Sequence, residues 1–134
     1  MKASAKSLVV FGIYLVGMGV GFVFMPNVLL GLLGFPATDE VWSRVVGMLA
    51  LVLAVYYIQA ARTDLQPFMR WTVVTRVAVF FFFTAFVVGG LAGPMMILLG
   101  VVDLLSALWT AWALHTEKKT TVDGANGLTK QATR

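Results

Sequence analysis

The chain has 134 residues, enough for one small domain, and carries a net charge of +4. It is 60% hydrophobic and only 12% charged, whereas soluble domains average about 45–50% apolar and about 25% charged residues. It contains no cysteine and a single histidine, His115, which excludes disulfides, iron–sulfur clusters and thiolate or bis-histidine metal sites. We therefore predict no metal and no cofactor. The basic residues flank apolar segments and form no single patch, so nucleic acid is not an expected partner.

Four apolar segments are long enough to cross a bilayer, since about 20 apolar residues span a hydrocarbon core of about 30 Å. They comprise residues 8–25, 41–61, 71–91 and 95–114. Pro26 ends the first segment, and Gly93-Pro94 predicts a tight turn that makes the last two segments antiparallel neighbours. We predict an all-α protein, an integral membrane antiparallel four-helix transmembrane bundle over residues 1–115.

Three regions outside these spans need their own interpretation. The apolar run 27–36 is too short to span and predicts an interfacial or re-entrant turn. Lys2 and Lys6 precede an apolar run, as in a signal peptide, but no small-residue cleavage site follows, so we expect an uncleaved first span. Residues 116–134 are polar, contain two glycines and show no apolar periodicity, which predicts a disordered cytoplasmic tail.

The basic residues near the ends of the spans predict the orientation, because cytoplasmic loops are enriched in lysine and arginine. Eight of them fall on one side of a four-span protein: Lys2, Lys6, Arg62, Arg70, Lys118, Lys119, Lys130 and Arg134. The opposite side offers Asp39 and Glu40, with Arg44 just inside the second span. We therefore place both the N- and the C-terminus in the cytoplasm.

Three charged residues lie inside the predicted spans, namely Arg44, Arg76 and Asp103. A charge at the bilayer centre costs about 2.5–3.5 kcal/mol or more unless it is paired or hydrated. Ser106 and Thr110 follow Asp103 on one helix face, and at 1.5 Å per residue Arg44 is slightly nearer to Asp103 in depth than Arg76 is. Two interpretations stay open: a structural ion pair, or a polar pocket that binds a head group or carries a proton.

A second set of residues shares a depth near the cytoplasmic side: Tyr14, Tyr56, Tyr57, Gln59 and Arg76. Their polar groups would suit an anion or a carbonyl. Alternatively, the tyrosines belong to the interfacial aromatic belt and Gln59 caps Arg76. We assign Tyr57 to the belt and leave Tyr56 open. The candidate ligand-binding or structural cluster is then Arg44, Arg76, Asp103, Ser106, Tyr56 and Gln59.

Two G-x-x-x-G spacings, at residues 17–21 and 89–93, place small residues on one helix face and allow another helix to approach closely. We favour packing within the monomer over a dimer face.

Three stretches together resemble a known family. They are Val41-Trp-Ser-Arg44 with Gly47, Tyr56-Tyr-Ile-Gln-Ala-Ala-Arg62 running to Pro67-Phe68 and Arg76, and Gly100-Val-Val-Asp103 leading to Ala107-Leu-Trp-Thr110. The arrangement resembles the BphX-like group of small bacterial four-helix membrane proteins, which are loosely akin to DoxX-like proteins, over nearly everything before the tail. The resemblance implies a bacterial inner (plasma) membrane location and a four-helix bundle. The group has no established activity, and any functional positions would match Arg44, Arg76 and Asp103.

Three hypotheses for function follow. In the first, the bundle binds or handles a hydrophobic small molecule, such as a lipid, a quinone or an aromatic compound, in an intramembrane polar pocket. In the second, it is a non-catalytic accessory subunit of a membrane complex, whose glycine faces dock the partner. In the third, it transports a small solute as a homo-oligomer, with Asp103 as a proton-coupled carboxylate. The sequence has no glycine-rich phosphate loop and no Ser–His–Asp set, so it defines no catalysed reaction.

Overall fold

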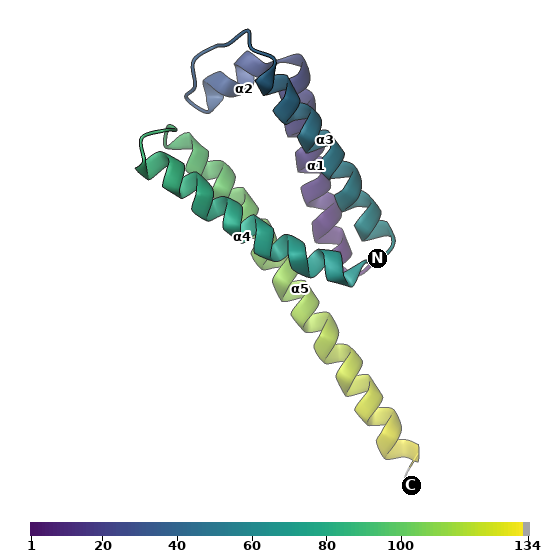
Figure 1. The fold of residues 1–134 in the computed structure, drawn as a ribbon. Coiled ribbons are helices and arrows are strands. Elements are labelled where there is room, and N and C mark those ends of the chain that lie inside the picture. Colours follow the sequence, from purple (N-terminus) through teal and green to yellow (C-terminus); the bar gives the residue numbers. More distant parts are fainter. Residues whose placement is uncertain (133–134) are drawn as a thin grey trace.

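The computed structural model describes residues 1–132, which form five α-helices and contain no strand (Figure 1). The helices are α1 (Ala3–Phe24), α2 (Pro26–Leu32), α3 (Trp42–Arg62), α4 (Gln66–Val88) and α5 (Met95–Ala132). All of them except α2 are long and apolar enough to cross a membrane. The prediction of an all-helical chain with four long apolar helices is therefore confirmed.

Helix α1 begins at Ala3, five residues before the predicted span, and two other helix starts differ from the prediction because of proline. Helix α4 begins at Gln66, five residues earlier than expected, because Pro67 lies in the first turn, where a proline breaks no hydrogen bond. The same effect starts α2 at Pro26, so the first part of the predicted turn 27–36 is a short helix. After α4, Gly90 adopts a φ of 72°, a left-handed conformation that favours glycine.

The C-terminal segment also differs from expectation. The sequence predicted a disordered tail from Thr116, whereas α5 continues as one helix to Ala132 and extends well beyond the other helices (Figure 1). Its residues beyond Glu117 are exposed, which explains why the sequence shows no apolar period there. Threonine hydroxyls at positions 116, 120 and 121 each donate to the carbonyl four residues earlier.

The long helices form two pairs, α1 with α3 and α4 with α5 (Figure 1). The pairs meet near the N-terminus and the start of α4, and they diverge toward α2 and the α4–α5 connection (Figure 1). Glycines set the close approach of α1 and α3. A Cβ built on Gly47 would lie 2.7 Å from the carbonyl oxygen of Gly19, and one on Gly19 would lie 2.9 Å from that of Gly47. The 17–21 spacing is not itself this contact, because Gly17 faces open space and Gly21 packs on Leu29 of α2.

The buried core lies at the end where the pairs meet. Its members come from α1, α3 and α4: Ala5, Leu8, Phe11, Tyr57, Ala60, Ala61 and Met69. Elsewhere large apolar side chains cover the outside of the helices, and Phe81, Phe82 and Val88 are among the exposed ones. An outer surface of this kind is what a helix presents to lipid and is unusual for a protein surrounded by water.

Two polar contacts also join segments at this end. Lys2 forms a salt bridge with Asp64 in the α3–α4 connection, and Glu117 of α5 accepts hydrogen bonds from the Ser4 amide at 2.9 Å and the Ser4 hydroxyl at 2.7 Å. The hydrogen bond with Lys2 holds the pKa of Asp64 below its ordinary value, and the same bond raises the pKa of Lys2. The N-terminus, the α3–α4 connection and residue 117 therefore lie together.

Candidate functional site

Arg76 is the largest fully buried side chain in the described residues, with 2% of its surface exposed. It projects from α4 and binds groups on three other helices. Its Nε donates to the Tyr57 hydroxyl at 3.4 Å, and its Nη1 donates to Ser106 Oγ and Thr110 Oγ1, each at 3.3 Å. The guanidinium carbon also lies 3.9 Å from the ring centroid of Phe11 and 4.8 Å from that of Tyr57.

These contacts leave the Arg76 guanidinium incompletely satisfied. Its Nη2 is buried and has no hydrogen-bond partner among residues 1–132, and no carboxylate in that range forms a salt bridge with it. Neutral hydroxyls and aromatic faces stabilise a buried cation only in part, with about 2 kcal/mol for a desolvated cation–π contact. Because a buried charge normally has a close partner, Nη2 is a donor ready for one more acceptor.

A cavity of about 560 Å³ lies between the two helix pairs and includes Arg76 in its wall. Its volume falls within the range of about 300–1,000 Å³ that is usual for small-molecule sites. The polar members of the wall are Tyr14, Tyr57, Thr75, Arg76 and Asp103. The remaining thirteen are apolar, from α1, α3, α4, α5 and the residue after α2: Phe11, Leu15, Met18, Phe22, Leu33, Val46, Leu49, Ala50, Leu53, Val79, Phe83, Met96 and Leu99.

Asp103 lies half-buried on the wall of this cavity. Its carboxylate accepts no hydrogen bond and forms no salt bridge within residues 1–132, although its charge interacts with that of Arg76 at longer range. Tyr14 also lies on this wall, and it interacts electrostatically with Asp103. Of the two arginines considered from the sequence, Arg76 is thus the one near Asp103, and the two are not sealed into a close ion pair.

Arg44 lies apart from this site. It is exposed, and its Nη1 donates to the carbonyl oxygen of Val23 in the last turn of α1, where backbone carbonyls lack a partner within the helix. The expectation that Arg44 is the nearer partner of Asp103 is therefore not met in the structure. A depth estimate along a helix gives the height of a residue but not the face from which its side chain leaves.

The tyrosines exchange the roles expected from the sequence. Tyr57, assigned to the aromatic belt, is 7% exposed and binds Arg76, whereas Tyr56 is 58% exposed. Neighbouring residues on a helix point about 100° apart, and Tyr57 shares its face with Ala54 and Ala61, whose small side chains mark a packed surface. Gln59 is exposed and does not cap Arg76.

The structure therefore unites three members of the sequence-based cluster, Arg76, Asp103 and Ser106, and separates Arg44, Tyr56 and Gln59 from them. Phe11 was missed as a partner of Arg76, and Tyr57 was considered beside Arg76 but assigned to the aromatic belt. Within residues 1–132 no group of three or more histidine, cysteine, aspartate or glutamate side chains is arranged to hold a metal ion.

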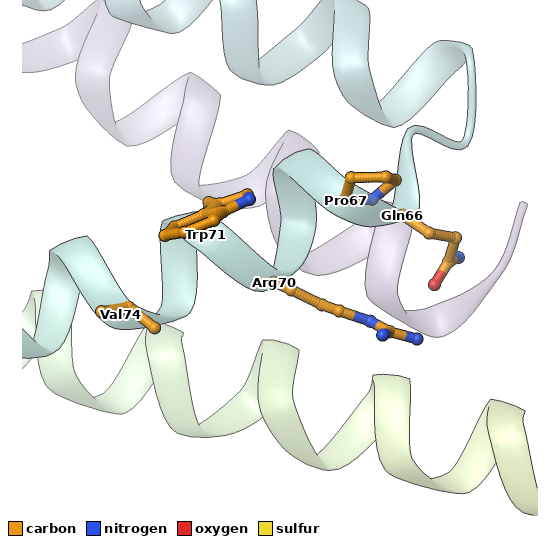
Figure 2. A pocket seen from close by; sticks show the side chains of 5 residues that line it. All are labelled: Gln66, Pro67, Arg70, Trp71 and Val74. Atoms are coloured by element: carbon orange, nitrogen blue, oxygen red, sulfur yellow. The ribbon is translucent and has the colours of Figure 1, made fainter.

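A second pocket, of about 540 Å³, lies at the start of α4 (Figure 2). It is lined by Gln66, Pro67, Arg70, Trp71 and Val74. Arg70 and Trp71 extend away from each other, so the side chains do not converge on one point (Figure 2). An exposed arginine and tryptophan at the end of an apolar helix are typical of a membrane interface. The cavity beside Arg76 is the better candidate for a binding site.

No family model, curated protein or solved structure matches the chain. The BphX-like resemblance therefore stays a prediction, and the functional argument depends on the Arg76 cavity.

Proposed function

We propose that this chain is a membrane protein that crosses the bilayer four times, with both ends in the cytoplasm, and binds a hydrophobic small molecule in the cavity between its helix pairs. The observation that carries the binding function is the Nη2 of buried Arg76, which no residue among 1–132 binds, beside a largely apolar cavity. The guanidinium holds the polar end of the ligand, and the apolar faces of both helix pairs hold the remainder.

The four-span topology has independent support. An even number of crossings brings the N-terminus, the α3–α4 connection and residue 117 to the same side, and the Lys2–Asp64 and Ser4–Glu117 contacts join these three segments. The exposed apolar side chains of the long helices suit a lipid environment. The orientation itself follows from the basic residues at this end.

Reporter fusions test the topology. A reporter that works only in the cytoplasm should be active when it is placed after residue 134 or in the α3–α4 connection. A reporter that works only outside the cytoplasm should be active at Thr38. An external signal at either of the first two positions contradicts the four-span proposal.

Proton-coupled transport of a small solute is the second candidate, because Asp103 borders the cavity with a carboxylate that no described residue binds. It requires a continuous aqueous path, which four helices supply only in an oligomer. A structural ion pair, the other interpretation of these charges, would suit a non-catalytic accessory subunit. The separation of Asp103 from Arg76 does not favour it.

Native mass spectrometry tests the binding function. The protein released from its own membrane should carry a bound amphiphile, which Arg76→Gln loses and Arg44→Gln keeps, because Arg44 lies outside the cavity. Leu99→Trp supplies a variant that fills the cavity without changing its polar groups, and it should also lose the ligand. Bound mass that persists in both Arg76→Gln and Leu99→Trp refutes this site, and its absence from every sample refutes the binding function.

A further inference from the structure

We propose that the ligand of this cavity is an uncharged amphiphile whose polar end carries both a hydrogen-bond acceptor and a hydroxyl group. This inference rests on the binding function proposed above and names the class of molecule that the site selects. It comes from the two charged residues of the cavity wall, Arg76 and Asp103, considered together.

The charges on the cavity wall favour an uncharged ligand. The wall carries one cation and one anion, and these interact at long range without forming a salt bridge. An anionic head group at Arg76 would bring a second negative charge near Asp103, and the mostly apolar wall would screen the repulsion poorly. A cationic head group at Asp103 would likewise bring a second positive charge near Arg76, and the two would repel each other. A neutral head group leaves the balance unchanged.

The two charged residues also call for complementary hydrogen-bonding groups on the ligand. A guanidinium offers only donors, and an ionised carboxylate offers only acceptors. Among residues 1–132 the buried donor without a partner is Arg76 Nη2, and the carboxylate oxygens of Asp103 are acceptors without a partner; the Tyr14 hydroxyl lies on the same wall. A ligand that satisfies both presents a carbonyl or ester oxygen to Arg76 and a hydroxyl to Asp103. Polar groups that are buried without partners cost about 1–3 kcal/mol each, so a ligand with only one of the two functions leaves the other residue unsatisfied.

The remaining wall residues suit an apolar tail on the ligand. Thirteen of the eighteen wall residues are apolar, and they lie on both helix pairs. The wall extends from Arg76 past Met18 and Leu49 to Leu33, beyond α2, and Met96, at the start of α5. A hydrocarbon tail fits this surface, while a second polar group there would find no partner. The class is therefore a hydroxyl-bearing ester or ketone with one apolar tail.

A series of probes with one common tail tests the inference: monododecanoylglycerol, which has the ester and the hydroxyls, methyl dodecanoate, which lacks the hydroxyls, and dodecanoate, which is ionised at alkaline pH. Their dissociation constants are measured on the full chain in lipid nanodiscs from which the endogenous ligand has been exchanged. Monododecanoylglycerol should bind about tenfold tighter than either other probe, a difference of about 1.4 kcal/mol. Asp103→Asn removes the negative charge, so this preference over dodecanoate should shrink or reverse, whereas Arg44→Gln should leave it unchanged.

The outcomes separate the two proposals. If dodecanoate binds as tightly as monododecanoylglycerol to the wild-type protein, or more tightly, the neutral-ligand inference is wrong and the binding function stands. Equal binding of methyl dodecanoate shows that Asp103 does not receive a hydroxyl, which also overturns the inference. If no probe binds although an endogenous mass copurifies with the chain, only the ligand class is wrong. These comparisons need the wild-type protein alone and hold even if Asp103→Asn does not fold.

Discussion

The guanidinium carbon of Arg76 in α4 lies 3.9 Å from the ring centroid of Phe11 in α1, and this contact joins the two helix pairs. Tyr57 of α3 contacts the same guanidinium with its ring and its hydroxyl, and it also packs against Phe11 with ring centroids 5.2 Å apart. Aromatic rings from α1 and α3 therefore flank one buried charge on α4. The aromatic faces replace part of the hydration that the guanidinium loses on burial.

We expect Phe11→Leu to lower the free energy of unfolding by about 1–3 kcal/mol, because it removes both the cation–π contact and buried aromatic volume. Thermal unfolding in one detergent, followed by circular dichroism, measures the change. The matched control is Phe81→Leu, since Phe81 is 64% exposed and its ring packs against that of Phe80. Equal shifts for the two variants contradict the role of Phe11.

The close contact of Gly19 with Gly47 predicts that a larger residue at position 47 lowers stability. A methyl group on Gly47 meets the Gly19 carbonyl oxygen at 2.7 Å, and backbone at that distance has to move. Gly47→Ala should therefore destabilise the protein by about 1–3 kcal/mol, the usual cost of overpacking. Gly17→Ala is the control, because a Cβ there meets nothing within 4 Å and alanine is a better helix former than glycine. Stability of Gly47→Ala equal to that of Gly17→Ala refutes the close contact.

The sequence predicted the long helices well and the identity of the site only in part. Apolar length locates a span because the bilayer has a fixed thickness, so the starts of α3 and α5 lie within one residue of the expected positions. The start of α1 was missed by five residues, since it lies at Ala3. The starts of α2 and α4 were missed because each depends on a proline in the first turn, which stops a helix in one context and begins it in another.

Within the site, membrane energetics identified Arg76 and Asp103 because charged residues stand out in apolar segments. The same argument misplaced Arg44, which uses a carbonyl at the end of α1 as its partner. The depth argument also kept Tyr56 in the site in place of Tyr57. Neighbouring residues lie at similar depths but on different faces of the helix. The spacing of small residues around Tyr57 held the missing information, since Ala54 and Ala61 lie on its face.

The salt bridge of Lys2 with Asp64 gives stability a dependence on pH. The bond lowers the pKa of Asp64, so its contribution is present above the ordinary aspartate value of 3.8 and is lost as pH falls through the lower value of the folded protein. The melting temperature of Asp64→Asn should thus fall less than that of the wild type below about pH 4. Asparagine suits this test because Asp64 has a φ of 50°, which asparagine tolerates. Both side chains are well exposed, so the difference should be small and should vanish in high salt. Identical acid profiles in low salt contradict the bond.

The contact of Glu117 with Ser4 makes it possible to test whether the C-terminal segment is helical or disordered. The Ser4 amide lies in the first turn of α1, where backbone N–H groups lack partners within the helix, and Glu117 accepts from it and from the Ser4 hydroxyl. The carboxylate also interacts favourably with the positive end of the helix dipole.

Glu117→Ala should therefore cost about 0.5–2 kcal/mol, the usual effect of deleting a helix cap, and should speed hydrogen exchange of the Ser4 amide. Asp123→Ala is the matched control, because Asp123 is an exposed acid six residues further along α5. If the segment from residue 116 were disordered, as its composition alone predicts, the two substitutions would have equal and negligible effects. A selective loss in Glu117→Ala shows instead that α5 continues past His115 far enough to hold the first turn of α1.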